Sequence, residues 1–375
     1  MTKTADLLDS RTDPVLVWDQ LKNLAPEELI QWRVAPLNTG QSAAQRNIDL
    51  PIPFGWFAIC YSDELQTSEV KPFHYFDKEL VAWRGEDGSA RILDAYWPHL
   101  GAHMGYGGKV DGNHLQCPFH AWRWNGEGSA VEIPYSKSIP PKMRKPDCDR
   151  SYPTREVNGF VWAWYHPDNT EPLYEVQTFA EIGDPAWSDY EKHEWIVRGP
   201  IQTIAENGAD SAHFQFIHGV ANSPNYDITF DGHRRSAEVR AKMGTPRGLV
   251  DGTIAYGVDG SGQPWTRFSG ICETLLITGV TPISKDLTHL RFAFTQLKSD
   301  RDGENGGVAR AIIKDICKQL DQDKVVWDRQ RYVEQPPLCA GDGPINDFRD
   351  FFRQFYAGSQ WDKYRDSALK RSISR

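Results

Sequence analysis

The sequence predicts an α+β protein with two domains, an N-terminal domain of antiparallel strands and a C-terminal domain in which helices flank an antiparallel sheet. Short apolar runs bounded by turn residues fill residues 48–168, and longer strand-like runs mix with helical patterns beyond residue 195. The chain has 375 residues, a length that suggests two domains or one large domain with an insertion. We therefore expect a helical extension at 1–47 and domains at 48–168 and 169–375.

The elements of the first domain follow from local patterns. Residues Pro14 to Val34 form an amphipathic segment that predicts one or two short helices. Five runs of strand length, each bounded by Gly, Asp, Asn or Pro, then predict a compact antiparallel domain: GWFAICY, ELVAWRG, ARILDAY, HLQCPF and GFVWAWYH.

The second domain opens with a helical pattern at 195–220. Strands are expected at 237–243, 252–257, 270–281 and 288–298. A long helix from Val308 to Tyr332 and an aromatic-rich helix at 346–357 complete the predicted domain.

Composition and charge limit the classes of function. The net charge of −9 argues against binding of nucleic acid or of an anionic membrane surface. No apolar run approaches the roughly 20 residues of a membrane span, and the N-terminus lacks the apolar segment of a secretory signal. The six cysteines show no paired spacing, as is typical of reduced thiols. We expect a cytoplasmic protein.

Two loops between predicted strands carry residues that bind metals. The first, DAYWPHLGAHMG, contains His99, and the second, CPFHAW, contains Cys117 and His120 after an interval of seventeen residues. A Rieske [2Fe–2S] cluster has two Cys on one iron and two His on the other, supplied by a Cys-x-His loop and a Cys-x-x-His loop. Three of the four cluster ligands are therefore present.

Trp97 occupies the remaining Cys position. An indole offers an N–H donor and no thiolate, so Trp97 cannot ligate iron, and its bulk crowds the space for the cluster. We expect the cluster to be bound poorly or not at all. Three interpretations explain the tryptophan: an engineered or accidental substitution, a natural loss of redox function, or an unorthodox cluster. We favour the first, because one base change converts a Cys codon to a Trp codon.

The segment ENGADSAHFQFIHG carries a second polar group. Asn207, Asp210 and His213 recur every three residues and would share one face of a helix. His218 follows His213 by five residues, about 140° round an ideal helix. Both imidazoles can reach one metal only if the helix bends or ends there, which Gly219 would permit. An ordinary solvated helix face is the alternative.

The predicted long helix supplies a carboxylate. Its apolar stripe consists of Ile312, Ile316, Leu320 and Trp327. Asp323 lies on the same stripe, and a buried carboxylate needs a partner, for which a metal is the natural candidate. Asp321 and Asp328 lie off the stripe and are expected to face solvent. Two His and one carboxylate on one side of Fe(II) leave positions open for O₂ and substrate.

The paired loops, the motif Asp210-x-x-His213-x-x-x-x-His218 and the late helical acid resemble the oxygenase component of Rieske non-heme iron oxygenases. The resemblance implies an antiparallel β Rieske [2Fe–2S] domain followed by a helix-grip catalytic domain. It makes His213, His218 and Asp323 the ligands of a mononuclear Fe(II). It further implies that Asp210 connects an iron ligand to the Rieske histidine of a neighbouring subunit in a homotrimer, and that Asn207 lies beside the iron.

The blocks HLGAHMGYGGKVDGNHLQCPFHAWRW, EVNGFVWAWYH and GDGPINDFRDFFRQFY resemble the steroid-acting branch, the 3-ketosteroid 9α-hydroxylases and sterol 7-desaturases. This implies O₂-dependent hydroxylation or desaturation of a hydrophobic polycyclic substrate, with electrons from an NAD(P)H-dependent flavin/iron–sulfur reductase or a ferredoxin. We expect Trp97 to impair this activity. The alternatives are an aromatic-acid O-demethylase, a cluster-less inactive variant and a non-catalytic lipid-binding protein.

Overall fold

The computed structural model describes residues 20–37, 41–46, 48–219, 227–245, 248–270, 272–304, 306–339 and 341–358, without the side chains of residues 227 and 241–250. The predicted α+β class is confirmed. The chain divides into a small unit, Phe54–Thr178, and a large unit made of the described residues up to Pro53 and from Phe179 onward. The domain boundaries expected from the sequence stay a prediction. None of the described helices is both long and apolar enough to span a membrane.

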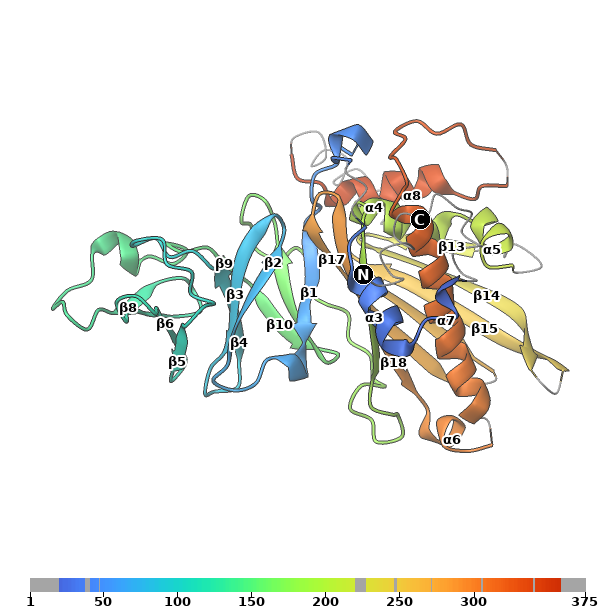
Figure 1. The fold of residues 1–375 in the computed structure, drawn as a ribbon, viewed down its shortest axis with the longest axis horizontal. Coiled ribbons are helices and arrows are strands. Elements are labelled where there is room, and N and C mark those ends of the chain that lie inside the picture. The colour runs from blue at the N-terminus through green and yellow to red at the C-terminus, as the bar shows by residue number, and fades with distance from the viewer. Residues whose placement is uncertain are drawn as a thin grey trace. The chain divides into compact units, whose positions relative to one another are not determined.

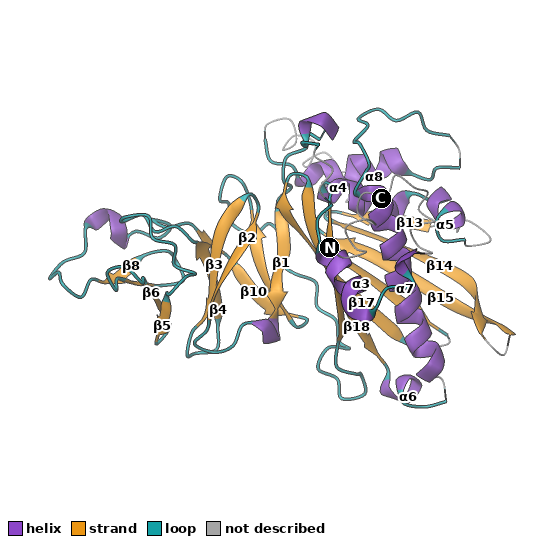
Figure 2. Cartoon of the chain, in the orientation of Figure 1, coloured by secondary structure: helices purple, strands orange, loops and turns teal. Residues whose placement is uncertain are grey.

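The small unit consists of short antiparallel strands in three sheets, with orders β1-β11-β10, β2-β3-β4-β9 and β5-β6-β7-β8 (Figure 2). The strands are β1 Gly55–Tyr61, β2 Val70–Tyr75, β3 Lys78–Arg84, β4 Ala90–Asp94, β5 Lys109–Asp111, β6 His114–Gln116, β7 Arg123–Trp124, β8 Ala130–Glu132, β9 Ser151–Tyr152, β10 Thr154–Val157 and β11 Phe160–Tyr165. Each of the five predicted strand runs contains an observed strand.

Strands β5 and β6 lie between the two predicted cluster loops along the chain, and β7 and β8 follow the second loop. The first loop joins β4 to β5 and the second joins β6 to β7. A Cβ at Gly108 would lie 2.1 Å from the carbonyl oxygen of Met104, so the first loop can close in this form only with glycine there. The backbone therefore keeps the close turn that brings the two loops together.

The buried carboxyl group of Asp149 predicts a pH-dependent stability of the small unit. The side chain is buried, and among the described residues its Oδ2 finds no hydrogen-bond partner. Burial, and then the charge of Asp94, raise the pKa of Asp149 to about 8. The unfolded chain releases this proton near pH 4, whereas the folded chain keeps it, so stability falls as the pH rises from about 4 to about 8.

We expect the Asp149→Asn variant to remove this contribution, whose slope is at most about 1.4 kcal/mol per pH unit for one proton. Denaturant titration at about pH 5 and pH 8, followed by tryptophan fluorescence, measures the difference. The wild-type protein should lose more stability between the two pH values than the variant. Equal losses in both proteins would contradict the assignment.

The large unit contains, within its described residues, a seven-stranded antiparallel sheet of order β12-β18-β17-β16-β15-β14-β13. Figure 1 shows helix α7 crossing one face of this sheet, as the helix-grip expectation requires. The strands are β12 Glu191–Val197, β13 Asp227–Asp231, β14 Arg234–Thr245, β15 Gly248–Asp259, β16 Gln263–Ser269, β17 Thr274–Ser284 and β18 Leu287–Gln296. The helices are α3 Pro26–Val34, α4 Ile201–Glu206, α5 Ala212–Phe216, α6 Lys298–Arg301, α7 Gly306–Trp327 and α8 Ile345–Phe352.

The helical expectation for 195–220 is wrong in part. Residues up to Val197 belong to β12, where pairing with β18 overrides the local helical pattern. The remainder breaks into α4, a 3₁₀ turn at Asn207–Ala209 and α5. Asn207, Asp210 and His213 therefore do not share the face of one continuous helix.

Helix α7 ends at Trp327, five residues before the predicted end at Tyr332. The buried guanidinium of Arg46 explains the early end: its Nη2 donates to the carbonyl oxygens of Trp327, at 3.1 Å, and Gln330, at 2.9 Å. A cation that binds the last carbonyls of a helix satisfies acceptors that a further turn would otherwise use.

The buried face of α7 is turned by one residue from the predicted stripe in its first half. Ile313 and Cys317 are buried, whereas Ile312 and Ile316 are only half-buried. Neighbouring positions on a helix differ by about 100°, so packing against the sheet decides which of two adjacent apolar residues faces inward.

Candidate functional site

His213, His218 and Asp323 converge in the large unit. One ligand atom from each lies within 4.8 Å of the others, and among the described residues no other group of three His, Cys, Asp or Glu side chains does so. Nε2 of His218 lies 3.3 Å from Oδ1 of Asp323, and both side chains are almost fully buried. The arrangement is that of a two-histidine, one-carboxylate metal site.

The local fold explains how two imidazoles five residues apart meet. Helix α5 carries His213 and ends at Phe216, so His218 lies in the segment that follows it. Gly219 then adopts a φ of +73°, in the left-handed region that favours glycine. The end of the helix required by the sequence spacing is therefore observed.

Hydrogen bonds orient both imidazoles. Nδ1 of His213 lies 2.7 Å from the carbonyl oxygen of Asp210, and Nδ1 of His218 lies 3.0 Å from Oε1 of Gln322. Because each acceptor holds a proton on Nδ1, each Nε2 carries the lone pair that a metal would bind. The residues present fit a divalent ion in this position.

Asn207 and Asp210 lie beside this group. Nδ2 of Asn207 is 3.2 Å from both Nε2 of His213 and Oδ2 of Asp323. Oδ1 of Asp210 accepts hydrogen bonds from the backbone N–H groups of Ala212, at 3.0 Å, and His213, at 3.3 Å. Burial raises the pKa of Asp210, but these bonds and the interaction with His213 outweigh it and lower the pKa overall.

The carboxylate of Asp323 controls the protonation of His218. Burial lowers the pKa of His218, but the hydrogen bond and negative charge of Asp323 outweigh that effect and raise the pKa overall. A metal must therefore displace a proton from this imidazole at low pH.

Gln322 is the residue of this site that the sequence reasoning missed. Its position directly before the buried Asp323 is the only signal for it in the sequence.

We expect Gln322→Leu to weaken divalent-metal binding about 10–100-fold, because the partner of a ligating imidazole fixes its orientation and tautomer. Calorimetric titration with Co(II) measures the affinity. Gln319→Leu, on the same helix, is the matched control, and equal affinities of the two variants would contradict the role.

The expectation that Asp321 and Asp328 face solvent is wrong. Asp321 is 0% exposed and Asp328 is 2% exposed. Asp321 binds the guanidinium of Arg33, and Asp328 accepts a hydrogen bond from the backbone N–H of Arg198. These partners come from distant parts of the chain, so the periodicity of the helix alone contains no sign of them.

The predicted cluster loops bring His99 and His120 together in the small unit. Their ring centroids are 5.3 Å apart, and Nδ1 of His99 is buried without a hydrogen-bond partner among the described residues. A buried nitrogen with a free lone pair fits a metal ligand. Cys117 is 3% exposed and its thiol is free. The two imidazoles are therefore as close as the histidine pair of a Rieske site requires, and their role as ligands stays a prediction.

Trp97 occupies the cysteine half of that site. It is 3% exposed and belongs to the apolar core of the small unit. Its ring meets Trp124 edge-on, with centroids 3.8 Å apart, and lies 5.7 Å from Trp122. Since one iron would keep Cys117 as its single protein thiolate, the residues present do not fit an intact Rieske cluster.

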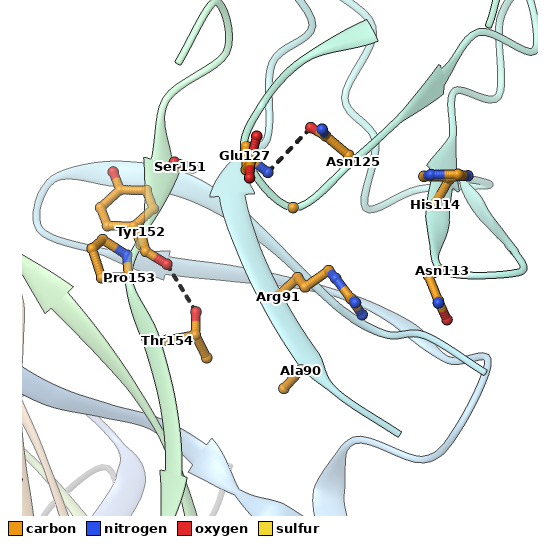
Figure 3. A pocket seen from close by; sticks show the side chains of 11 residues that line it. Ala90, Arg91, Asn113, His114, Asn125, Glu127, Ser151, Tyr152, Pro153 and Thr154 are labelled. Atoms are coloured by element: carbon orange, nitrogen blue, oxygen red, sulfur yellow. Dashed lines mark hydrogen bonds between the residues drawn. The ribbon is translucent and has the colours of Figure 1, made fainter. Parts of the chain in front are cut away.

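A polar cavity of about 510 Å³ lies elsewhere in the small unit, lined by residues of β4 and β9 and of the turns that join β5 to β6 and β7 to β8 (Figure 3). Its wall includes Arg91, His114 and Glu127. Nη2 of Arg91 lies 2.6 Å from Asp87, so this guanidinium is already paired. The cavity brings together no further group of metal ligands.

Comparison with known families decides the relationship. A model of the Rieske [2Fe-2S] domain matches residues 55–144, and a model of the 3-ketosteroid 9alpha-hydroxylase C-terminal domain matches residues 163–356. The chain belongs to this family of Rieske oxygenases. The family implies a Rieske cluster and a mononuclear non-heme iron.

Relatives within the family cover most of the chain. A cholesterol 7-desaturase nvd from Hemicentrotus pulcherrimus is 30% identical over 82% of this chain and 71% of its own length. A probable 3-ketosteroid-9-alpha-monooxygenase oxygenase component from Rhodococcus rhodochrous is 29% identical over 83% of each chain.

Solved structures share the fold of this chain. NdmA from Pseudomonas putida CBB5 with caffeine has a TM-score of 0.68 at 19% identity, over 84% of this chain and 94% of its own. Dicamba monooxygenase bound to dicamba has a TM-score of 0.63 at 19% identity, over 86% and 98%. At these identities the likeness concerns the fold alone.

Proposed function

We propose that the chain is an oxygenase component that uses O₂ to hydroxylate or desaturate a hydrophobic polycyclic, steroid-like substrate, and that Trp97 impairs its supply of electrons. The observation that carries the proposal is the convergence of His213, His218 and Asp323 within 4.8 Å. The substrate class rests on the relatives, which act on 3-ketosteroids and cholesterol according to their names.

Each residue of the site has a role in this proposal. His213, His218 and Asp323 would hold one Fe(II), which when bound supplies the chemistry of O₂ activation. Asp210 and Gln322 hold the imidazoles in the ligating tautomer through their hydrogen bonds at 2.7 and 3.0 Å. The Asn207 amide donates to the carboxylate of Asp323 and keeps it turned toward the imidazoles.

The reductant in this proposal is NAD(P)H, delivered through a separate flavin/iron–sulfur reductase or ferredoxin. Because the residues around Trp97 do not fit a Rieske cluster, we assign no electron-transfer step to this chain as it stands. The six free cysteines agree with a reducing, cytoplasmic location.

A homotrimer with His99 or His120 of one chain near Asp210 of the next belongs to the same proposal. The side chain of Asp210 is 38% exposed and lines a cavity of about 290 Å³. Large apolar side chains are exposed around the cluster loops, and such patches favour association. They are Tyr96, Leu100, Tyr106, Phe119 and Tyr135. Sedimentation equilibrium should give a trimer, and a strict monomer at micromolar concentration would count against it.

Metal content and peroxide-supported turnover test the function. We expect about one iron and almost no acid-labile sulfide per chain, since the mononuclear site is complete and the cluster site is not. Hydrogen peroxide is O₂ already reduced by two electrons and two protons, so it should support oxidation of a 3-ketosteroid or cholesterol without a reductase, with water as the by-product. Mass spectrometry detects the gain of one oxygen atom or the loss of two hydrogens. His213→Ala should abolish the reaction. Steroid binding without iron or oxidation would favour a lipid-binding protein instead.

A further inference from the structure

A buried ion pair connects the N-terminal segment to the metal-binding helix. Nε and Nη2 of Arg33 in α3 each donate to a different carboxylate oxygen of Asp321 in α7, both at 2.8 Å. Nε1 of Trp195 in β12 donates to Oδ1 of Asp321 at 2.8 Å, and the guanidinium of Arg33 lies 4.7 Å from the centroid of that indole. One carboxylate thus joins α3, α7 and β12.

A second set of contacts one turn further along α7 repeats this connection. Nζ of Lys324, 0% exposed, donates to the carbonyl oxygens of Ala35, at 3.3 Å, and Ile196, at 2.6 Å, and to Asp328, at 2.8 Å. Nη2 of Arg46 donates to the carbonyl oxygen of Trp327 at the end of the helix. Contacts from Arg33, Ala35 and Arg46 therefore hold α7 both before and after Asp323 along the helix.

These contacts lie on the face of α7 that is opposite the metal site. Asp321, Lys324 and Asp328 recur at spacings of three and four and share a face, whereas Asp323 lies about 200° from Asp321 around the helix. Rotation of α7 that would move Asp323 away from His218 must therefore break the pair between Arg33 and Asp321.

Energetics favour a positioning role over a purely stabilising one. Burial of two charges costs several kcal/mol per ion, and well-packed apolar side chains often stabilise as much as a buried ion pair or more. A bidentate pair instead fixes one rotation and one axial position of a helix. Metal sites tolerate only about 0.2 Å of error in ligand distance, so that precision has a use here.

We propose that Arg33 and Asp321 are positioning residues that set the rotation of α7 and so place the carboxylate of Asp323 against His213 and His218. On this account Arg33, in the N-terminal segment, supports the metal centre through Asp321. The inference rests on the proposed function only in taking these three side chains as metal ligands.

The test replaces the pair by apolar residues in the double variant Arg33→Met/Asp321→Leu. This variant avoids an unpaired buried charge and should fold, although Nε1 of Trp195 loses its acceptor. Arg33→Met alone leaves Asp321 without its counter-ion, and its unfolding transition measures that cost. The control is the double variant Arg84→Met/Glu156→Leu, which removes a bidentate pair at 2.6 and 2.8 Å in the small unit. Thermal unfolding, Co(II) affinity and the Co(II) absorption spectrum are measured for each.

We expect the Arg33→Met/Asp321→Leu variant to keep a cooperative unfolding transition and to bind Co(II) about tenfold or more weakly, with an altered spectrum, as loss of a supporting contact does elsewhere. The control should bind Co(II) as the wild type does. A Co(II) affinity within twofold of the wild type, with an unchanged spectrum, would overturn the proposal and leave the pair a structural feature.

A metal-free measurement separates this inference from the proposed function. Nε2 of His218 lies 3.3 Å from Oδ1 of Asp323, so the ¹⁵N chemical shifts of His218, measured on protein stripped of metal by a chelator, report whether this carboxylate faces the imidazole. In the Arg33→Met/Asp321→Leu variant these shifts should move toward those of Asp323→Asn, and unchanged shifts would contradict positioning. If the wild type binds no divalent metal, the proposed function fails, whereas the positioning role is still decided by these shifts.

Discussion

Replacement of Trp97 by cysteine should give the protein the reddish-brown absorption of a Rieske cluster and raise its iron content from about one to about three per chain, with about two acid-labile sulfides. The cysteine adds the second thiolate that the iron beside Cys117 lacks. It also removes the indole that packs against Trp122 and Trp124. Visible spectroscopy and chemical assay of iron and sulfide measure the result, which should be accompanied by NAD(P)H-driven turnover with a suitable reductase.

Trp97→Ser is the matched control, since it removes the same bulk without adding a thiolate. We expect this variant to stay colourless and to lose stability, because loss of a buried tryptophan from a core costs about 3–5 kcal/mol. Trp97→Cys without iron should lose a similar amount and recover part of it when the cluster is bound. The comparison therefore separates the effect of space from the effect of the ligand.

A full [2Fe–2S] complement in the unmodified protein would contradict the role assigned to Trp97. The missing thiolate would then come from elsewhere, with Cys60 and Cys148 the first candidates. Cys148 packs against the core that contains Trp97, whereas Cys60 lies in β1. Burial raises the pKa of the Cys148 thiol, and its Sγ already donates to the carbonyl oxygen of Gly128 at 2.8 Å. Cys148→Ser would decide whether it serves.

Local patterns were sufficient for much of the fold. Runs bounded by turn residues predicted strands in both units, because short apolar runs and turn chemistry are properties of neighbouring residues. Strand β12 escaped prediction, since Trp195 and Val197 become a strand only by pairing with Leu290 and Thr288 nearly a hundred residues later. Long-range pairing of this kind leaves little trace in a short window of sequence.

The candidate site, too, was predictable from the sequence only in part. The spacing of His213, His218 and Asp323 within their segments pointed to a metal centre, because the donor atoms themselves define the chemistry. The environment of Asp321 could not be predicted, because its partner Arg33 lies 288 residues away in the sequence. A charged residue next to a predicted ligand is equally consistent with solvent exposure until its partner is known.

Asp323→Asn should abolish metal binding at the mononuclear site, by more than about a hundredfold, since loss of an outer partner alone costs about 10–100-fold and this change removes a ligand charge. The amide keeps the shape of the side chain, so the fold should survive. Asp315→Asn, on the exposed face of α7, is the matched control and should bind Co(II) as the wild type does. If Asp323→Asn kept wild-type affinity while Asp321→Asn lost it, the carboxylate ligand would have to be Asp321 after a rotation of the helix. The buried, bidentate contact of Asp321 with Arg33 argues against that outcome, because the rotation would leave a guanidinium without its counter-ion inside the protein.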